Sequence, residues 1–73
     1  MILISAIEHS IVISSDQVIK DGIVEVEKIR VHKNNIVSVS DTDFIRIPVK
    51  EKGQYKVKVK FEGQQCSKTI NVF

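Results

Sequence analysis

The amino-acid sequence predicts an all-β protein, folded as one small domain over residues 1–73. A chain of 73 residues is too short for two ordinary domains. Ile and Val occur 12 and 11 times, whereas Leu and Ala occur once each. β-Branched residues favour strands, while helices favour Ala and Leu. Apolar and polar residues also alternate along much of the chain, which indicates strands with one buried face.

The first 22 residues predict two strands and one turn of helix. Apolar residues recur over residues 2–7 and again over residues 11–13, and the break between them falls near residues 8–10. Residues 15–22 begin with an N-cap residue and end with a glycine. This pattern predicts a single helical turn between the second strand and the next.

The middle of the chain predicts two more strands. Val24 and Val26 occupy even positions, whereas Ile29 and Val31 occupy odd positions. A continuous strand would change faces there, so we expect a β-bulge or a tight turn at residues 27–28. Residues 36–39 predict a further strand, followed by a turn at residues 41–43, where two aspartates flank a threonine.

The last third of the chain has the clearest strand pattern. Residues 45–49, 55–61 and 66–72 each alternate between apolar and polar side chains, with a four-residue hairpin loop predicted at residues 62–65. Pro48 cannot donate to a ladder, so we expect the first of these strands at an edge or at a bulge. The alternation predicts a buried set: Ile45, Ile47, Tyr55, Val57, Val59, Phe61, Ile70 and Val72.

Residues 44–73 resemble strands E, F and G of immunoglobulin-like β-sandwich modules from bacterial surface proteins and phage virions. Gly53 and Tyr55 match the glycine and tyrosine that open strand F in those modules. The resemblance implies a small antiparallel sandwich of six to seven strands, in which the tyrosine hydroxyl bonds back to nearby backbone. The Trp and the Cys pair of antibody domains are absent. A small barrel of the oligonucleotide-binding or SH3-like kind is the alternative fold.

Positive charge is concentrated in the second part of the chain. Residues 1–43 have a net charge of −3, whereas residues 44–73 have a net charge of +5. Lys56, Lys58 and Lys60 occupy every second position of one strand, which lines them up on one face about 7 Å apart. With Arg46 they form a candidate basic face for nucleic-acid phosphates, although no aromatic residue interleaves to stack on bases. Lysines on an exposed strand also discourage aggregation, and we favour that role.

The sequence contains no catalytic motif. His9 and His32 belong to no metal-binding pair, and Cys66 lies in the apolar phase, where a thiol is buried and inert. Four aspartates near predicted turns could gather around a hard cation, but such aspartates usually form Asx turns. They are Asp16, Asp21, Asp41 and Asp43. We therefore expect no enzymatic activity, no metal and no cofactor.

Both ends of the chain have apolar residues that one buried face cannot cover. Residues 1–7 have apolar side chains in both phases, and Phe73 is out of phase with the apolar residues before it. We therefore expect self-association through an exposed strand, with Met1, Leu3, Ile7 and Phe73 at the interface. The opposite charges of the two parts favour a head-to-tail contact, and a symmetric dimer through the first strand is the simpler alternative.

The resulting hypothesis is a non-enzymatic structural or binding module that acts through protein contacts. The resemblance implies a phage virion accessory protein or a bacterial adhesive domain. A basic nucleic-acid-binding barrel and a host-directed protein inhibitor are the alternatives. Residues 1–7 lack the features of a signal peptide, so we expect synthesis in the cytoplasm, no membrane insertion, and a final location in a virion or in host cytoplasm.

Overall fold

Five antiparallel strands make up the protein in the computed structural model, which describes residues 1–31 and 33–73. No helix occurs among these residues, so the all-β prediction is confirmed. The strands are β1 (Ile2–Ile7), β2 (Ser10–Lys28), β3 (Lys33–Pro48), β4 (Gly53–Phe61) and β5 (Gln64–Val72).

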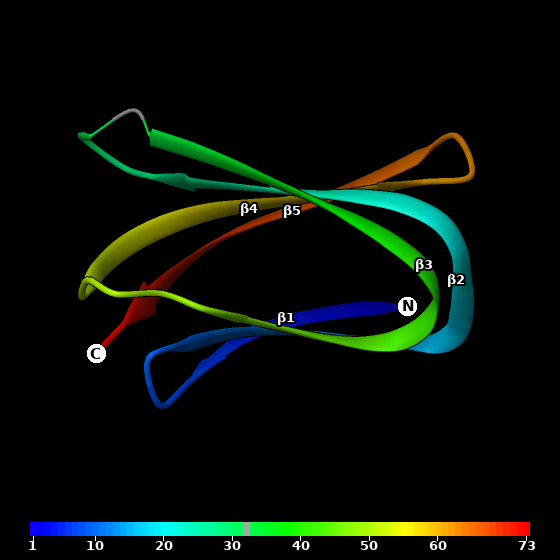
Figure 1. The fold of residues 1–73 in the computed structure, drawn as a ribbon, viewed down its shortest axis with the longest axis horizontal. Coiled ribbons are helices and arrows are strands. Elements are labelled where there is room, and N and C mark those ends of the chain that lie inside the picture. Colours follow the sequence, from blue (N-terminus) through cyan, green and yellow to red (C-terminus); the bar gives the residue numbers. More distant parts are fainter. Residues whose placement is uncertain (32) are drawn as a thin grey trace.

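The sheet is built around β2. The first part of β2 pairs with β1 on one side and with the end of β3 on the other. Its last part pairs with the beginning of β3 and with β4, which pairs in turn with β5. The sheet curls, so these two parts face each other as layers (Figure 1). The N-terminal layer is β1 with residues 10–15 and 44–48, and the C-terminal layer is residues 22–28 and 33–40 with β4 and β5.

β2 passes from one layer to the other at a bend. The register between β2 and β3 shifts between Ser14 and Ile19, where β2 has more residues than β3 has opposite them. The helical turn predicted for residues 15–22 is wrong, because this segment belongs to β2 throughout. Ile19 is buried in the core from this segment, so burial of an apolar side chain outweighs the local N-cap signal.

β3 bends beside β2 at the aspartates that were expected to form a turn. Asp41 has a φ of 50°, in the left-handed region. The Thr42 hydroxyl donates to the Phe44 carbonyl (2.9 Å) and accepts from the Phe44 N–H (3.2 Å). These local bonds replace ladder bonds at the bend. The chain therefore changes direction here but does not leave β3.

Two-residue turns connect the hairpins. Glu8 and His9 separate β1 from β2, with φ values of 44° and 64°. Glu62 and Gly63 separate β4 from β5, with φ values of 47° and 73°, so the predicted four-residue loop is wrong. Positive φ at both positions is the geometry of a type I′ turn, which suits the twist of paired strands. The β-bulge or tight turn expected at residues 27–28 does not lie there, because both residues belong to β2, and the turn follows at residues 29–31.

The described chain has five strands where six to seven were expected. The reason is that β2 and β3 each run through both layers. Residues 11–13 and 24–26 are thus two parts of one strand, as are residues 36–39 and 45–48. Pro48 is the last residue of β3, and β3 has a paired neighbour on one side alone, as the edge prediction requires.

The core lies between the two layers. Six of the eight residues predicted to be buried are buried, while Ile45 and Phe61 are partly buried and pack against the core. Residues 1–43 contribute Ile4, Ile11, Ile13, Ile19, Val24, Val26 and Val39.

Lys68 connects β5 to β1, the two strands between which the curled sheet has no ladder. Lys68 lies opposite Val57 in the β4–β5 ladder, so it belongs to the inward phase of β5. Its Nζ donates to the Ile4 carbonyl of β1 at 3.0 Å. The contact joins the C-terminal layer to the backbone of β1, and it satisfies an acceptor that has no strand partner on that side.

Candidate functional site

The lysine face is exposed on the outer side of the C-terminal layer, but it is not purely basic. Lys56 and Lys60 are exposed and Lys58 is half-buried. Glu27 lies opposite Lys56 and Glu25 opposite Lys58 on the neighbouring β2. The Nζ of Lys60 is 3.8 Å from Oε2 of Glu25. Two carboxylates therefore lie among the three ammonium groups, which weakens the attraction of this face for phosphates.

Arg46 is not part of the lysine face. It lies in the N-terminal layer, opposite Val12 in the β2–β3 ladder, and it points to the outer side of that layer. Its Nε donates to the Ser10 hydroxyl at 3.0 Å, and Ser10 is buried beneath it. The structure therefore separates Arg46 from the three lysines with which the sequence analysis had grouped it.

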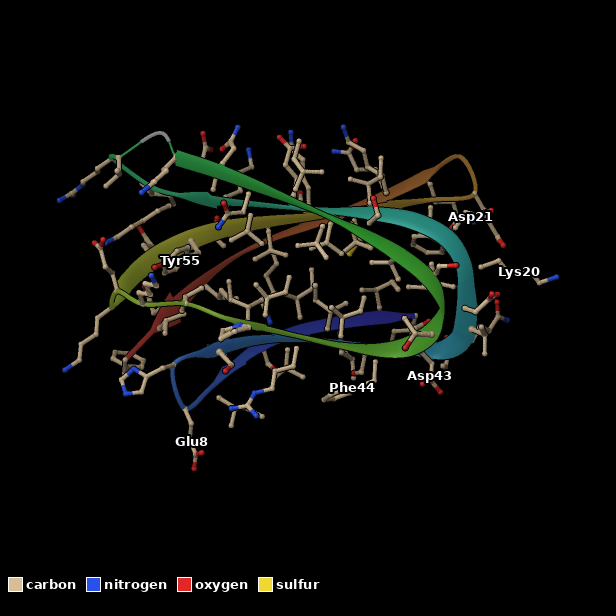
Figure 2. All side chains as sticks on the ribbon, in the orientation of Figure 1. Glu8, Lys20, Asp21, Asp43, Phe44 and Tyr55 are labelled. Atoms are coloured by element: carbon tan, nitrogen blue, oxygen red, sulfur yellow. The ribbon has the colours of Figure 1, made fainter. Side chains whose placement is uncertain are left out.

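The outer side of the N-terminal layer has three large apolar side chains that are exposed. Leu3, Ile7 and Phe44 are 59%, 55% and 55% exposed there. Figure 2 shows Phe44 on the side of its layer that faces away from the interior. The β1–β2–β3 register places Leu3, Ser14 and Phe44 in one row, with Ile7, Ser10 and Pro48 in another. The outer patch comprises the exposed Leu3, Ile7, Phe44 and Pro48 and the buried Val12, with Arg46, Ser5 and Ser14 among them.

Two predicted interface residues, Leu3 and Ile7, lie in the outer patch, whereas Met1 and Phe73 do not lie together. The two termini lie toward opposite ends of the molecule (Figure 1). The Met1 ammonium bonds to Oδ1 of Asp16 at 2.6 Å and thereby lowers the pKa of that carboxyl. Phe73 is exposed on a separate groove of about 620 Å³, together with Ile29 and Gln54.

The candidate chemical groups are dispersed. His9 is exposed in the β1–β2 turn, and His32 lies outside the described residues. Cys66 is half-buried against the core, so its thiol is less enclosed than the sequence indicated. Asp21 and Asp43 lie toward one end of the molecule (Figure 2). Within residues 1–31 and 33–73, no cluster of three or more acidic, histidine or cysteine side chains has the geometry to hold a metal ion.

An ion pair and a tyrosine hydrogen bond hold the connection between β3 and β4. Lys28 pairs with the Glu51 carboxylate, and this hydrogen bond lowers the pKa of Glu51. The Tyr55 hydroxyl donates to the Glu51 carbonyl at 2.6 Å. Tyr55 is buried while its hydroxyl is satisfied by backbone, which fixes where the chain enters β4.

The sequence pattern did not predict that Phe44, Val12 and Pro48 share one surface. Phe44 precedes the strand predicted at residues 45–49, and Pro48 was expected only to mark an edge or a bulge. The alternation of Phe44, Arg46 and Pro48 with the inward Ile45 and Ile47 indicates that these three side chains share the outer face. What the sequence could not give was the pairing of this segment with β1 through β2, which brings Leu3 and Ile7 to the same face.

No family model, curated protein or solved structure matched this chain. Among the described residues, no helix is both long and apolar enough to cross a membrane.

Proposed function

We propose that this protein is a non-enzymatic binding module that docks a protein partner on the outer patch. The observation that carries this proposal is the apolar outer side of the N-terminal layer, where Leu3, Ile7 and Phe44 are more than half exposed. The inner side of the same layer is already occupied by the core. Exposed apolar side chains that gather on one surface often mark a site of contact with another protein.

The partner has an apolar surface with a carboxylate near its centre. Arg46 lies among the apolar side chains and uses one N–H for Ser10. No described carboxylate forms an ion pair with it. A guanidinium has five N–H donors and favours bidentate contact with a carboxylate. Aromatic residues and arginine surrounded by apolar contacts are also the usual composition of an energetically important interface centre.

The immunoglobulin-like relationship, and with it a virion accessory or bacterial adhesive role, is part of this proposal. Its support is the bond from the Tyr55 hydroxyl to the Glu51 carbonyl, because the resemblance implies such a corner at this tyrosine. A module of that class acts by contact and not by catalysis. The proposed location follows from the same resemblance and is a virion or host cytoplasm.

Binding by matched surface variants tests the proposal. Tagged wild-type protein, incubated with an extract of the cells that contain it, is used to isolate a retained partner, which is then purified. We expect Leu3→Ser and Phe44→Ser each to raise the Kd for that partner about tenfold or more. Ile23→Ser, which alters an exposed isoleucine on the outer side of the C-terminal layer, should change the Kd less than about twofold.

Two results would contradict the proposal. The first is that the partner binds all three variants with equal affinity. The second is that every protein retained by the wild type is also retained by the Leu3→Ser and Phe44→Ser variants. A labelled oligonucleotide serves as a separate probe for the basic face. Because Glu25 and Glu27 lie among the lysines, we expect no binding whose affinity falls steeply between about 50 and 200 mM salt.

A further inference from the structure

We propose that two copies of this chain pair antiparallel along β3, with the twofold axis at Val37. The contact would join the two C-terminal layers into one continuous sheet. It uses the edge of the C-terminal layer and not the outer patch. A test of this dimer is therefore independent of a test of the proposed function.

The first argument is the free edge of β3. Among the described residues, β3 pairs with β2 alone, so the backbone groups on its other side have no strand partner. Natural edge strands are usually protected by charged side chains, proline or bulges. Residues 34–40 contain no charge and no proline. Ile36, within this segment, is 67% exposed.

The second argument is the charge at the two ends of this segment. The end near the β2–β3 turn is basic, with Lys28, Arg30 and Lys33 against Glu27 and Glu51, of which Glu51 pairs with Lys28. The end at the bend is acidic, with Asp21, Asp41 and Asp43. Figure 2 shows Asp21 and Asp43 at this end of the molecule, together with Lys20. In an antiparallel pair of copies, the basic end of each segment lies beside the acidic end of the other. The twofold axis repeats this contact at both ends. Parallel pairing would bring like charges together, which disfavours it.

The third argument sets the register. With Val37 opposite its own copy, Lys33 lies opposite Asp41, and Ile36 lies opposite Ser38. The two Ile36 side chains are then diagonal neighbours, about 7–8 Å apart between backbones and within reach of each other. This register therefore combines charge pairing at both ends with apolar contact at the centre. Because the contact is isologous, it closes as a dimer and does not grow into a filament.

Cysteine cross-linking tests the register. In a Cys66→Ser background, Val37→Cys places two thiols directly opposite each other, at a Cα separation of about 4.5–5.5 Å that a disulfide can span. Ser38→Cys is the matched control, since it is more exposed but lies diagonally from its copy. We expect a rapid disulfide dimer of Val37→Cys under mild oxidation and little from Ser38→Cys. Equal cross-linking of both, or cross-linking of Ser38→Cys alone, would overturn the proposal.

Sedimentation of variants with an intact cysteine tests the contact without a cross-link. Wild-type protein should form a dimer whose dissociation constant rises with salt, because part of the attraction is ionic. Ile36→Lys should raise this constant about tenfold or more, since lysine blocks edge pairing. Ile23→Lys makes the same change to an exposed isoleucine on the neighbouring β2 and should leave the dimer intact. A wild-type monomer at submillimolar concentration, or equal loss in both variants, would overturn the proposal.

Discussion

Among single residues, the valines of β4 contribute most clearly to stability. Val57 and Val59 are 0% and 1% exposed, and both pack between the two layers. Their neighbours Lys56 and Lys60 point to the outer side of the same strand. A small domain has few such fully buried positions, so each one accounts for a large share of its stability.

Truncation of these valines should therefore be costly. We expect Val57→Ala and Val59→Ala each to lower the free energy of unfolding by about 1–3 kcal/mol, through lost transfer energy and a residual cavity. Val18→Ala removes the same atoms from an exposed site, and it should change the free energy of unfolding by less than about 0.5 kcal/mol. Urea denaturation measures all three. Equal stability of the core variants and the Val18 control would contradict this assignment of the core.

Glu51 should make stability depend on pH in the acid range. Its hydrogen bond with Lys28 lowers the pKa of Glu51 in the folded state below the ordinary 4.5. The stabilisation is therefore fully present above about pH 4.5 and is lost as the pH falls through the folded pKa. We expect Glu51→Gln to be less stable than wild type at pH 7 and equal to it at low pH. Glu8→Gln removes a carboxylate without a described ion-pair partner and should change the stability at pH 7 by less than about 0.5 kcal/mol.

Among the elements, the hairpins differ in how well their turns suit the required backbone. Both two-residue turns have positive φ at both positions. The β4–β5 turn has Gly63 at its second position, whereas the β1–β2 turn has His9 there. Residues other than glycine adopt this region at a cost of about 1–2 kcal/mol. The fold accepts that cost at His9, whose carbonyl also receives the Val49 N–H at 2.9 Å.

Exchanging the residue types at these turns should have opposite effects. His9→Gly should stabilise the protein by about 0.5–1 kcal/mol, since relief of the backbone exceeds the added entropy of the unfolded chain. Gly63→Ala should destabilise it by about 1 kcal/mol or more. A Cβ at Gly63 would meet no atom within 4 Å, so that loss would come from the backbone and not from a clash. Thermal unfolding measures both, and a change of the same sign in both variants would contradict the turn geometry.

At the scale of the whole molecule, the curled sheet remains open between β1 and β5. The two strands are in contact but form no ladder, and Lys68 reaches across to the Ile4 carbonyl. Lys68→Met keeps most of the apolar stem and removes this bond. We expect amide exchange in β1 to become about fivefold faster, which corresponds to about 1 kcal/mol for an exposed charged donor.

Lys56→Met is the matched control for that measurement. It removes an exposed lysine from the outer side of β4 and leaves the contact of β1 with β5 unchanged. Amide exchange in β1 should therefore equal that of the wild type. Faster exchange in both variants would show that general charge loss, and not the bond to Ile4, controls the opening of β1.

The sequence predicted strand identity well and strand continuity poorly. The all-β class, the alternation of β4 and β5, and the edge position of Pro48 follow from local chemistry, namely β-branched composition, a period of two and a missing N–H. The alternation also identified most of the residues buried from the last third of the chain. The predicted helical turn and the four-residue hairpin loop were wrong, because N-cap and loop residues also occur in bent strands and in tight turns.

What the sequence alone determined is therefore the all-β class and, in the clearly alternating segments, which side chains face the same way. Tertiary structure alone decided that β2 and β3 bend through both layers, because the partners of those segments are far away along the chain. It also separated Arg46 from the lysines, set Glu25 and Glu27 among them, and gathered Leu3 with Phe44. The physical reason is that period-two alternation fixes a face within one strand, whereas a surface forms from the register between strands, which no single segment encodes.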